Sequence, residues 1–238
     1  MEHELETVHA KVIVPLGATA LAAVTGATRI SRYRGYVMQG NTAIHGRKVI
    51  PTYHPAASLR GQYILRYYIT ADFEKAKTQS AFAEIRRPTR RLVIPDTLSE
   101  CLEWLDTLGQ HRAYACDIEV VNFEVSCIGF APSADLAVSV PMYHQHWTFE
   151  EEVVLWKAIN KLLTGDATKI FQNGIFDCHF LATRCGIHVS QPIEDTMIAQ
   201  SVQYPELLKG LEFLVSIHCG AQAYYKDMVK WDNIKKEA

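Results

Sequence analysis

Apolar residues in the first third of the chain recur in patterns that predict strands and helices in alternation. Residues 12–16 form a short apolar run, and after a glycine turn the next apolar stretch reads as a helix that ends at Gly26. Two further strand candidates lie in residues 34–40 and 47–60, and the second of them runs into a loop at 52–59. A helix is then expected within residues 61–79, with its apolar positions at Ile64, Tyr67, Tyr68 and Ala71.

Beyond residue 88 the pattern becomes more regular. A short strand at residues 91–94 precedes a helix whose first turn carries the capping pair Thr97 and Glu100. Short polar turns separate three apolar runs and predict an antiparallel meander of strands at residues 112–120, 125–132 and 136–143. The remaining expected elements are a helix at 148–165, a strand at 168–174, and helices at 175–186, 194–203 and 209–220. This order predicts an α/β sheet of mixed strand direction.

A basic segment separates these two parts of the chain. Residues 86–91 contain four arginines and a proline, which predicts a boundary between a module at 1–88 and a module at 89–238. The first module holds 12 Lys and Arg against 6 Asp and Glu, and the second holds 12 against 20. This asymmetry favours contact with an anionic polymer beside a carboxylate-rich site. Two surfaces that are merely solvated are the alternative.

The composition excludes several classes of protein. No apolar run reaches the roughly 18 residues that a membrane span requires, and the N-terminus is acidic, unlike a secretory signal. We therefore expect a cytoplasmic protein without membrane contact. The cysteines form no C-x-x-C pair, which predicts reduced thiols rather than a zinc site or a disulfide framework. They are Cys101, Cys116, Cys127, Cys178, Cys185 and Cys219.

Candidate chemistry is concentrated in three carboxylates. Asp117 and Glu119 stand one residue apart in an apolar stretch, so a strand would place both on one face and Ile118 on the other. Two like charges at this spacing are costly to bury without compensation. Asp177 lies one turn into the helix after strand 168–174, and it could return to the pair. Hard oxygen ligands of this kind select Mg²⁺ or Mn²⁺, and paired ions suit displacement at phosphorus. On its own, the D-x-E pattern fits a polar strand edge equally well.

The succession of "DIE" (117–119), "NGIFD" (173–177) and "EDTMIAQ" (194–200) resembles the 3′–5′ exonuclease domain of family A DNA polymerases, especially of phage-type members. The resemblance covers about residues 90–231. It implies an α/β fold with an RNase H-like (DnaQ-like) mixed sheet and flanking helices, and a proofreading nuclease that acts on single-stranded 3′ ends of DNA with two Mg²⁺ or Mn²⁺ ions. By this resemblance Asp117 would bridge both metal ions. Glu119 would bind the ion that carries the attacking water, and Asp177 would hold the second ion.

The same resemblance implies roles around the carboxylates. Asn173 and Phe176 would line the cleft that receives the 3′-terminal nucleotides. Asp195 would lie near the site at the start of a helix, and its alternative role is an N-cap beside Thr196.

A fourth carboxylate is expected in the family, from a third motif of the form Tyr-x-x-x-Asp. The acidic candidate is Asp227 in "AYYKD", but Ala223 occupies the tyrosine position. We therefore expect that the chain stops at Ala238 before this motif, with a variant motif as the alternative. The metal site would then have three carboxylates in place of the four expected in the family.

The first module resembles the C-terminal half of uracil-DNA glycosylases, especially the iron–sulfur types, over residues 10–80. The similar segments are "KVIVPLGATALAAVTG", "RGYVMQG" and "KVIPTYHPAASLRG". The resemblance implies that His54 matches the histidine that stabilises the departing uracil and that Leu59 probes the gap of a flipped base. A turn histidine held by Pro55 is the alternative. The upstream half, with its water-activating loop, uracil pocket and cluster cysteines, is missing, so a small partial α/β module without an iron–sulfur cluster is expected.

Three functional hypotheses follow. The first is a metal-dependent 3′–5′ exonuclease that proofreads for a DNA polymerase. Such a protein could be encoded by a phage and act in the cytoplasm of the host. The second is a non-catalytic DNA-binding or assembly module that a polymerase domain or chain completes. The third is a remnant of a uracil-DNA glycosylase, which would excise uracil without a metal through His54.

Overall fold

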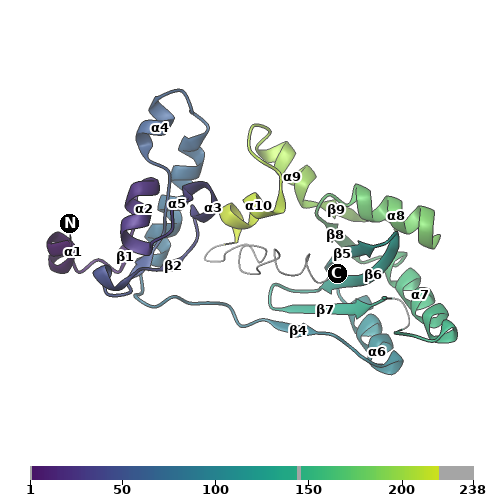
Figure 1. The fold of residues 1–238 in the computed structure, drawn as a ribbon. Coiled ribbons are helices and arrows are strands. Elements are labelled where there is room, and N and C mark those ends of the chain that lie inside the picture. The colour runs from purple at the N-terminus through teal and green to yellow at the C-terminus, as the bar shows by residue number, and fades with distance from the viewer. Residues whose placement is uncertain (1, 144–145, 220–238) are drawn as a thin grey trace. The chain divides into compact units, whose positions relative to one another are not determined.

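The computed structural model describes residues 2–143 and 146–219, which form two compact units (Figure 1). One unit consists of the residues up to Arg87 together with the segment that begins at Glu206, and the other is Pro88–Pro205. The second unit is therefore inserted into the first, because the chain leaves the first unit at Arg87 and returns to it at Glu206.

The inserted unit contains a six-stranded sheet. Its strands are β4 (Arg91–Val93), β5 (Ala113–Val121), β6 (Glu124–Ala131), β7 (Leu136–Pro141), β8 (Thr168–Phe171) and β9 (Ile193–Asp195). Its helices are α6 (Leu98–Gly109), α7 (Phe149–Leu163), α8 (Ile175–Cys185) and α9 (Thr196–Gln203). The strand order is β4-β7-β6-β5-β8-β9. Strands β5, β6 and β7 form the predicted antiparallel meander, and β4, β8 and β9 join it through parallel pairs. The prediction of a mixed sheet is confirmed.

Local sequence determines where the long helices of this unit begin. The predicted capping box at α6 forms, because Thr97 Oγ1 accepts the amide of Glu100 while the Glu100 carboxylate accepts the amide of Thr97. Thr148 and Glu151 make the same pair at α7. Both helices contribute to a core in which Ile128 on β6 is fully buried. Each such side chain contributes about 1.5–3 kcal/mol through burial, and the core holds β5 at the centre of the sheet.

The first unit has a smaller sheet. Its strands β1 (Val12–Ile13), β2 (Met38–Gln39) and β3 (Lys48–Val49) are ordered β1-β3-β2, with β1 parallel and β2 antiparallel to β3. Its helices are α1 (Glu2–Thr7), α2 (Ala18–Thr25), α3 (Ile30–Tyr33), η1 (Thr42–Ile44), α4 (Pro55–Leu59), α5 (Leu65–Gln79) and α10 (Leu211–His218).

Two local expectations for this unit need correction. The strand predicted at 12–16 pairs only at Val12 and Ile13, and Leu16 forms a single bridge to Thr52. Pro15 has no amide hydrogen to donate, which shortens the ladder. Residues 55–59, expected as a loop, form helix α4, because a proline at the first helical position has its φ pre-set and His54 caps the amide of Ala56.

A buried ion pair joins α10 to the rest of the first unit. Arg34 donates two hydrogen bonds to Asp72, at 2.7 and 3.1 Å, and a third to Ser216 Oγ on α10 at 3.0 Å. Thr52 Oγ1 donates to the same carboxylate. Lys75 donates to the Ser216 carbonyl at 2.6 Å, and burial lowers the pKa of Lys75 to about 8. Helix α10 is thus held by buried polar contacts.

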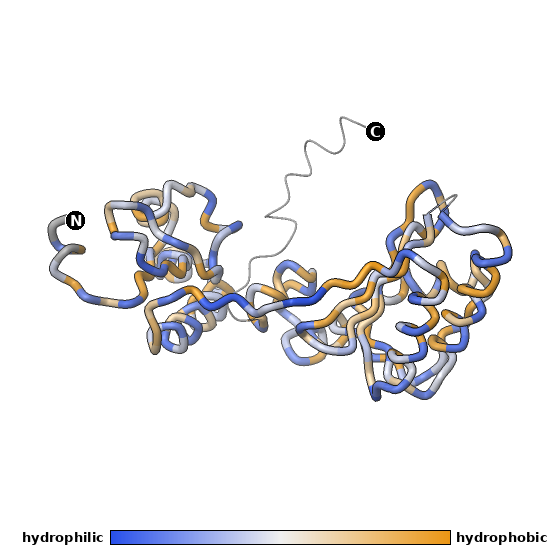
Figure 2. Tube along the Cα trace, turned by 90° about the horizontal axis from the view of Figure 1, so that it is seen from below, coloured by the Kyte–Doolittle hydropathy of each residue, from blue (hydrophilic) through white to orange (hydrophobic). Residues whose placement is uncertain are grey.

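The link into the inserted unit is polar, in contrast to the strand that follows it. Figure 2 shows the arginine-rich residues 86–91 as a hydrophilic run, after which the chain turns hydrophobic at the end of β4. None of the helices in the described ranges is long and apolar enough to cross a membrane.

Candidate active site

Strand β5 presents Asp117 and Glu119 on one face. Both residues are exposed, whereas Cys116 and Ile118 between and beside them are buried in the core. The alternation is the one predicted from the sequence. Strand β8 pairs with β5 only as far as Ala115, so the backbone of Ile118 lies beyond the last paired residue and is accessible to a side chain.

Asp177 of α8 occupies this position. Its Oδ1 accepts the amide of Ile118 at 3.0 Å, and its side chain is 4% exposed. This bond brings a third carboxylate to the backbone between Asp117 and Glu119. Burial raises the pKa of Asp177, and the nearby carboxylates of Asp195 and Glu119 raise it further, against the lowering effect of the Ile118 amide. The site therefore concentrates negative charge around the buried carboxylate of Asp177.

A tight turn between β8 and α8 sets the position of Asp177. Asn173 has φ of 62°, a left-handed conformation that asparagine tolerates better than most residues. Gly174 follows, and a Cβ there would come within 2.5 Å of the Phe171 Cβ, so any larger residue would shift the start of α8. Asp195 accepts both amides of this turn, from Asn173 at 3.2 Å and from Gly174 at 2.7 Å.

Asp195 also begins the next helix. Its carboxylate accepts the amides of Met197 and Ile198, as an N-cap of α9 does. The N-cap alternative considered from the sequence is what the structure places here. Because the same carboxylate holds the turn before α8, Asp195 supports the site through its hydrogen bonds and raises the pKa of Asp177.

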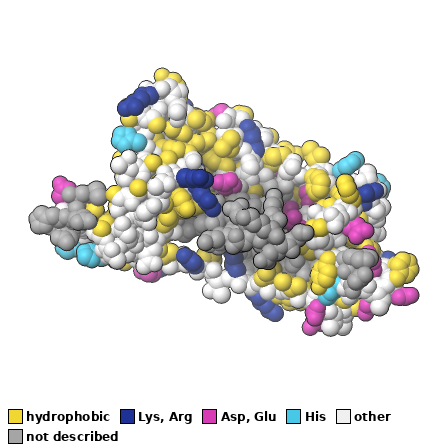
Figure 3. Space-filling view, viewed as in Figure 1, with side chains coloured by type: hydrophobic (Ala, Val, Ile, Leu, Met, Phe, Trp, Pro, Cys, Tyr) yellow, Lys and Arg dark blue, Asp and Glu magenta, His cyan; other side chains and the backbone are white. Residues whose placement is uncertain are grey.

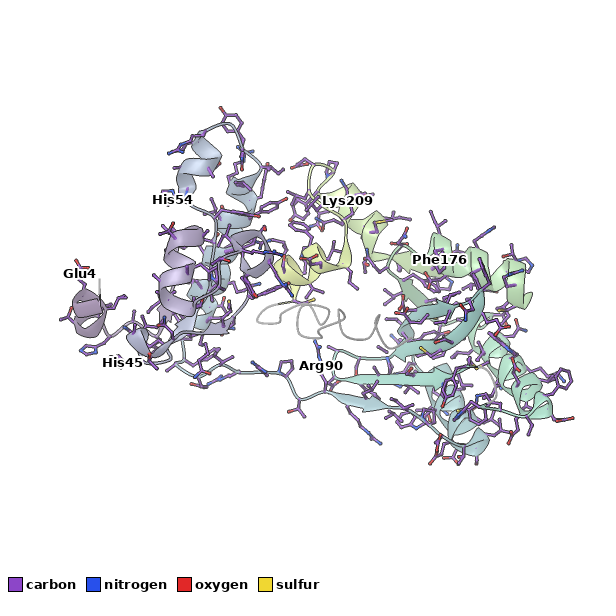
Figure 4. The ribbon with its side chains drawn as sticks, in the orientation of Figure 1. Glu4, His45, His54, Arg90, Phe176 and Lys209 are labelled. Atoms are coloured by element: carbon purple, nitrogen blue, oxygen red, sulfur yellow. The ribbon has the colours of Figure 1, made fainter. Side chains whose placement is uncertain are left out.

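Exposed apolar side chains lie in the first turns of α8 and α9, close in sequence to Asp177 and Asp195. Phe176 lies in the first turn of α8 (Figure 4) and is 53% exposed, next to Ile175 at 73%. Ile198 on α9 is also exposed. Figure 3 shows a group of hydrophobic side chains over α9 and the start of α8. Such exposed apolar surface beside polar groups is typical of binding sites.

Phe123 is a candidate that the sequence reasoning missed. It is 77% exposed at the tip of the β5–β6 hairpin, four residues after Glu119, with φ of 64°. Asn122 and Phe123 form the two-residue turn, where glycine would be usual at the second position. An exposed aromatic residue in a conformation that disfavours it suggests a functional reason for its presence. The signal in the sequence is "NF" in place of the usual "NG" between two strands.

The donor set fits a hard divalent cation. Asp117, Glu119 and Asp177 offer only carboxylate oxygens, the ligands that Mg²⁺ and Mn²⁺ prefer. Within residues 2–143 and 146–219, no three His, Cys, Asp or Glu side chains already stand as a metal-holding group. Binding of one ion by all three carboxylates would therefore require their side chains to rearrange.

The other predicted residues belong to other parts of the chain. In the first unit, His54 caps the start of α4 (Figure 4), and Leu59 is the last residue of that helix and is 81% exposed. The Nδ1 atom of His54 accepts the amide of Ala56. Asp227 and Ala223 lie outside the described residues.

Comparisons with known proteins agree with the two resemblances. Residues 92–236 match the model of a family described as 3′–5′ exonuclease. The DNA polymerase of Bacillus phage SP01 is 24% identical over an alignment of 235 residues that covers 84% of this chain and 25% of that protein. The type-4 uracil-DNA glycosylase of Thermotoga maritima is 38% identical over 78 residues, 32% of this chain and 39% of that enzyme. The chain thus spans about a quarter and about two fifths of these relatives.

Among solved structures, Brucella melitensis NrnC with bound Mg²⁺ is similar, with a TM-score of 0.41 and 22% identity over 58% of this chain and 64% of that one. The fold predicted from the resemblance is confirmed by the family match, as an α/β DnaQ-like exonuclease fold with a mixed sheet, accompanied by a small three-stranded sheet.

Proposed function

The chain belongs to the 3′–5′ exonuclease family of phosphodiester hydrolases, and from this we propose that it removes nucleotides one at a time from the 3′ end of single-stranded DNA. The observation that carries the proposal is the hydrogen bond from the Ile118 amide to Asp177 Oδ1, at 3.0 Å. This bond brings the carboxylate of α8 to the strand that bears Asp117 and Glu119.

The residues of the chain have distinct tasks in such a reaction. Asp117, Glu119 and Asp177 would hold Mg²⁺ or Mn²⁺ through their oxygens. When bound, these ions supply a water of lowered pKa and neutralise the charge that develops on the phosphate. The Ile118 amide and the hydrogen bonds of Asp195 keep Asp177 in place. Exposed Phe176 and Asn173 would contact the terminal nucleotides, the phenylalanine by stacking on a base.

The similarity to a phage DNA polymerase suggests the setting of this reaction. We propose that the activity serves proofreading beside a polymerase domain or chain, since the matched relative is a DNA polymerase. In the first unit, His54 and Leu59 are proposed DNA contacts, because both are exposed at the ends of α4.

Degradation of 5′-labelled single-stranded DNA in the presence of Mn²⁺ tests the proposal. We expect a ladder of products shortened from the 3′ end, which Asp117→Ala abolishes. Asp106→Ala is the matched control, because Asp106 is an exposed carboxylate on α6 outside the site. No products from the unmodified chain, or equal degradation by Asp117→Ala and the unmodified chain, would overturn the proposal. A chain that binds DNA and cuts only after a polymerase fragment is added would support the assembly-module alternative.

Uracil release from a uracil-containing duplex separates the glycosylase alternative from the nuclease. Excision that persists in a metal chelator and is lost in His54→Ala would favour a glycosylase.

A further inference from the structure

A cavity of about 670 Å³ opens in the inserted unit, and the three carboxylates are not among the residues that line it. Its walls come from the tip of the β5–β6 hairpin, from α7 and from α8. Strand β5 and helix α8 are also the two elements that meet at the hydrogen bond between Ile118 and Asp177. Helix α8 therefore takes part in both places, and Phe123 in the turn after β5 lines the cavity together with Glu124 and Val125 of β6.

A row of side chains on α8 connects the two places. The rings of Phe176 and Phe180 lie 6.0 Å apart, centroid to centroid, and Phe180 and Arg184 line the cavity. Residues four apart on a helix are neighbours on its surface. At a rise of about 1.5 Å per residue, Phe180 stands about 4.5 Å and Arg184 about 10.5 Å from Asp177 along the helix axis. Roughly two or three stacked nucleotides, at about 3.4 Å each, cover that distance.

Two tryptophans offer ring faces in the cavity, with their polar atoms already engaged. The indole nitrogen of Trp147 donates to the Pro141 carbonyl at 2.7 Å, and that of Trp156 donates to Glu152 Oε1 at 3.1 Å. Both rings pack partly against the core, and the part of each ring that lines the cavity remains available to a ligand. Stacking of bases on such surfaces tolerates any base sequence, which an exonuclease without sequence preference requires.

Two cations complete the lining. Lys157 on α7 and Arg184 on α8 are exposed, and neither side chain has an ion pair or hydrogen bond with another residue of the described ranges. Of the two carboxylates in the lining, Glu152 already accepts the indole of Trp156. An unpaired ammonium and an unpaired guanidinium beside stacking aromatics match the alternation of phosphate and base in a single strand.

We propose that this cavity binds single-stranded DNA two or more nucleotides upstream of the 3′ end that enters the carboxylate site. The identity of the ligand rests on the proposed function, because the path along α8 starts at the carboxylates that would cut the terminal phosphodiester. The cavity supplies affinity, and the carboxylates supply chemistry.

Fluorescence titration of the full chain with thymidine oligonucleotides in EDTA tests the proposal without cleavage. Two of the four tryptophans line the cavity, so binding there quenches the emission. We expect oligonucleotides of eight residues to bind about tenfold or more tighter than those of two residues, since one or two further bases can stack. Equal affinity for both lengths would overturn the proposal.

A pair of double variants with the same change of charge provides the control. Lys157→Gln with Arg184→Gln removes both cations of the cavity. Lys161→Gln with Arg112→Gln removes two exposed cations from elsewhere in the same unit. For the eight-residue oligonucleotide, the slope of log affinity against log salt should fall by about 1.4 in the first variant, as two lost phosphate contacts predict, and stay unchanged in the control. Equal slopes in both variants would contradict the proposal.

The outcomes separate this proposal from the nuclease proposal. If the chain releases nucleotides with Mn²⁺ but binds oligonucleotides of both lengths equally, the nuclease proposal stands and the proposed role of the cavity is refuted. If the chain binds the longer oligonucleotide through Lys157 and Arg184 but releases no nucleotide, the proposed role of the cavity stands and the nuclease proposal is refuted.

Discussion

Replacement of Phe123 should separate its effect on stability from its effect on function. The side chain is 77% exposed, so about a quarter of it is buried. A phenylalanine buries about 200 Å² when fully enclosed, so Phe123 removes roughly 50 Å² from water, which contributes about 1.2 kcal/mol. Both Phe123→Ala and Phe123→Gly forfeit this contribution. They differ in the backbone, which adopts φ of 64° at this position.

The left-handed conformation decides the order of the two variants. It costs a residue with a Cβ about 1–2 kcal/mol, whereas glycine adopts it freely but loses about 0.5–1 kcal/mol more conformational freedom on folding. The free energy of unfolding of Phe123→Gly should therefore be about 0.5–1 kcal/mol higher than that of Phe123→Ala and close to that of the unmodified chain. Elsewhere in a strand the order of glycine and alanine is the reverse.

Urea denaturation followed by tryptophan emission measures the stabilities, and a titration with single-stranded DNA measures the function. We expect both variants to weaken DNA binding by the same factor, about tenfold, because each removes the aromatic ring. An alanine variant as stable as the glycine variant would refute the backbone argument. DNA affinity that follows stability, or that does not change, would refute the assignment of Phe123 to the binding surface.

Three further predictions concern the first unit and the metal. Burial lowers the pKa of Lys75 from 10.5 to about 8, so Lys75 loses its proton at a lower pH in the folded chain than in the unfolded chain. The stability of the folded chain should therefore rise as the pH increases from about 8 to about 10.5. Lys75→Met should remove this dependence, as measured by thermal unfolding at several pH values. Arg34→Met leaves Asp72 buried without its cation and should cost about 3–5 kcal/mol in urea denaturation, and Arg34→Met with Asp72→Leu should recover most of the loss. Removal of divalent ions by EDTA should stop nucleotide release, and added Mn²⁺ should restore it, as measured by product ladders; release that continues in EDTA would contradict a metal-dependent reaction.

Local patterns in the sequence predicted the inserted unit well. The capping pair Thr97 and Glu100, the alternation around Ile118 and the meander at 113–141 depend on neighbours within a few residues, and all of them form. The convergence of Asp177 on this strand needed the order of the motifs, because the two residues that bond are 59 positions apart. Chain order, rather than composition, carried that information.

Other features depend on partners that no local pattern reveals. Strand β9 has three residues and forms because β8 pairs with it. The prediction missed this strand and assigned two of its residues to the helix expected at 194–203. Helix α10 was expected to belong to the second module, yet its Ser216 bonds to Arg34 across 182 positions. The left-handed turn at Phe123 follows from the register of β5 and β6, which the apolar pattern alone leaves open by a residue.

Asp177 provides the most direct test of the account, which holds that a buried carboxylate is kept at a cost in stability for the sake of metal-dependent cleavage. Its pKa is raised in the folded chain, chiefly by burial. The charged carboxylate therefore lowers the stability of the fold at any pH above this raised pKa. The penalty disappears as the pH falls toward the pKa of an ordinary aspartate. Asp177→Asn keeps an acceptor for the Ile118 amide and removes the charge.

The decisive measurement compares the thermal unfolding and the Mn²⁺-dependent nucleotide release of Asp177→Asn with those of the unmodified chain at pH 7. We expect a higher unfolding temperature, with a difference that shrinks at acidic pH, and nucleotide release reduced about 100-fold or more. A variant that unfolds at a lower temperature and still releases nucleotides from the 3′ end would contradict the account.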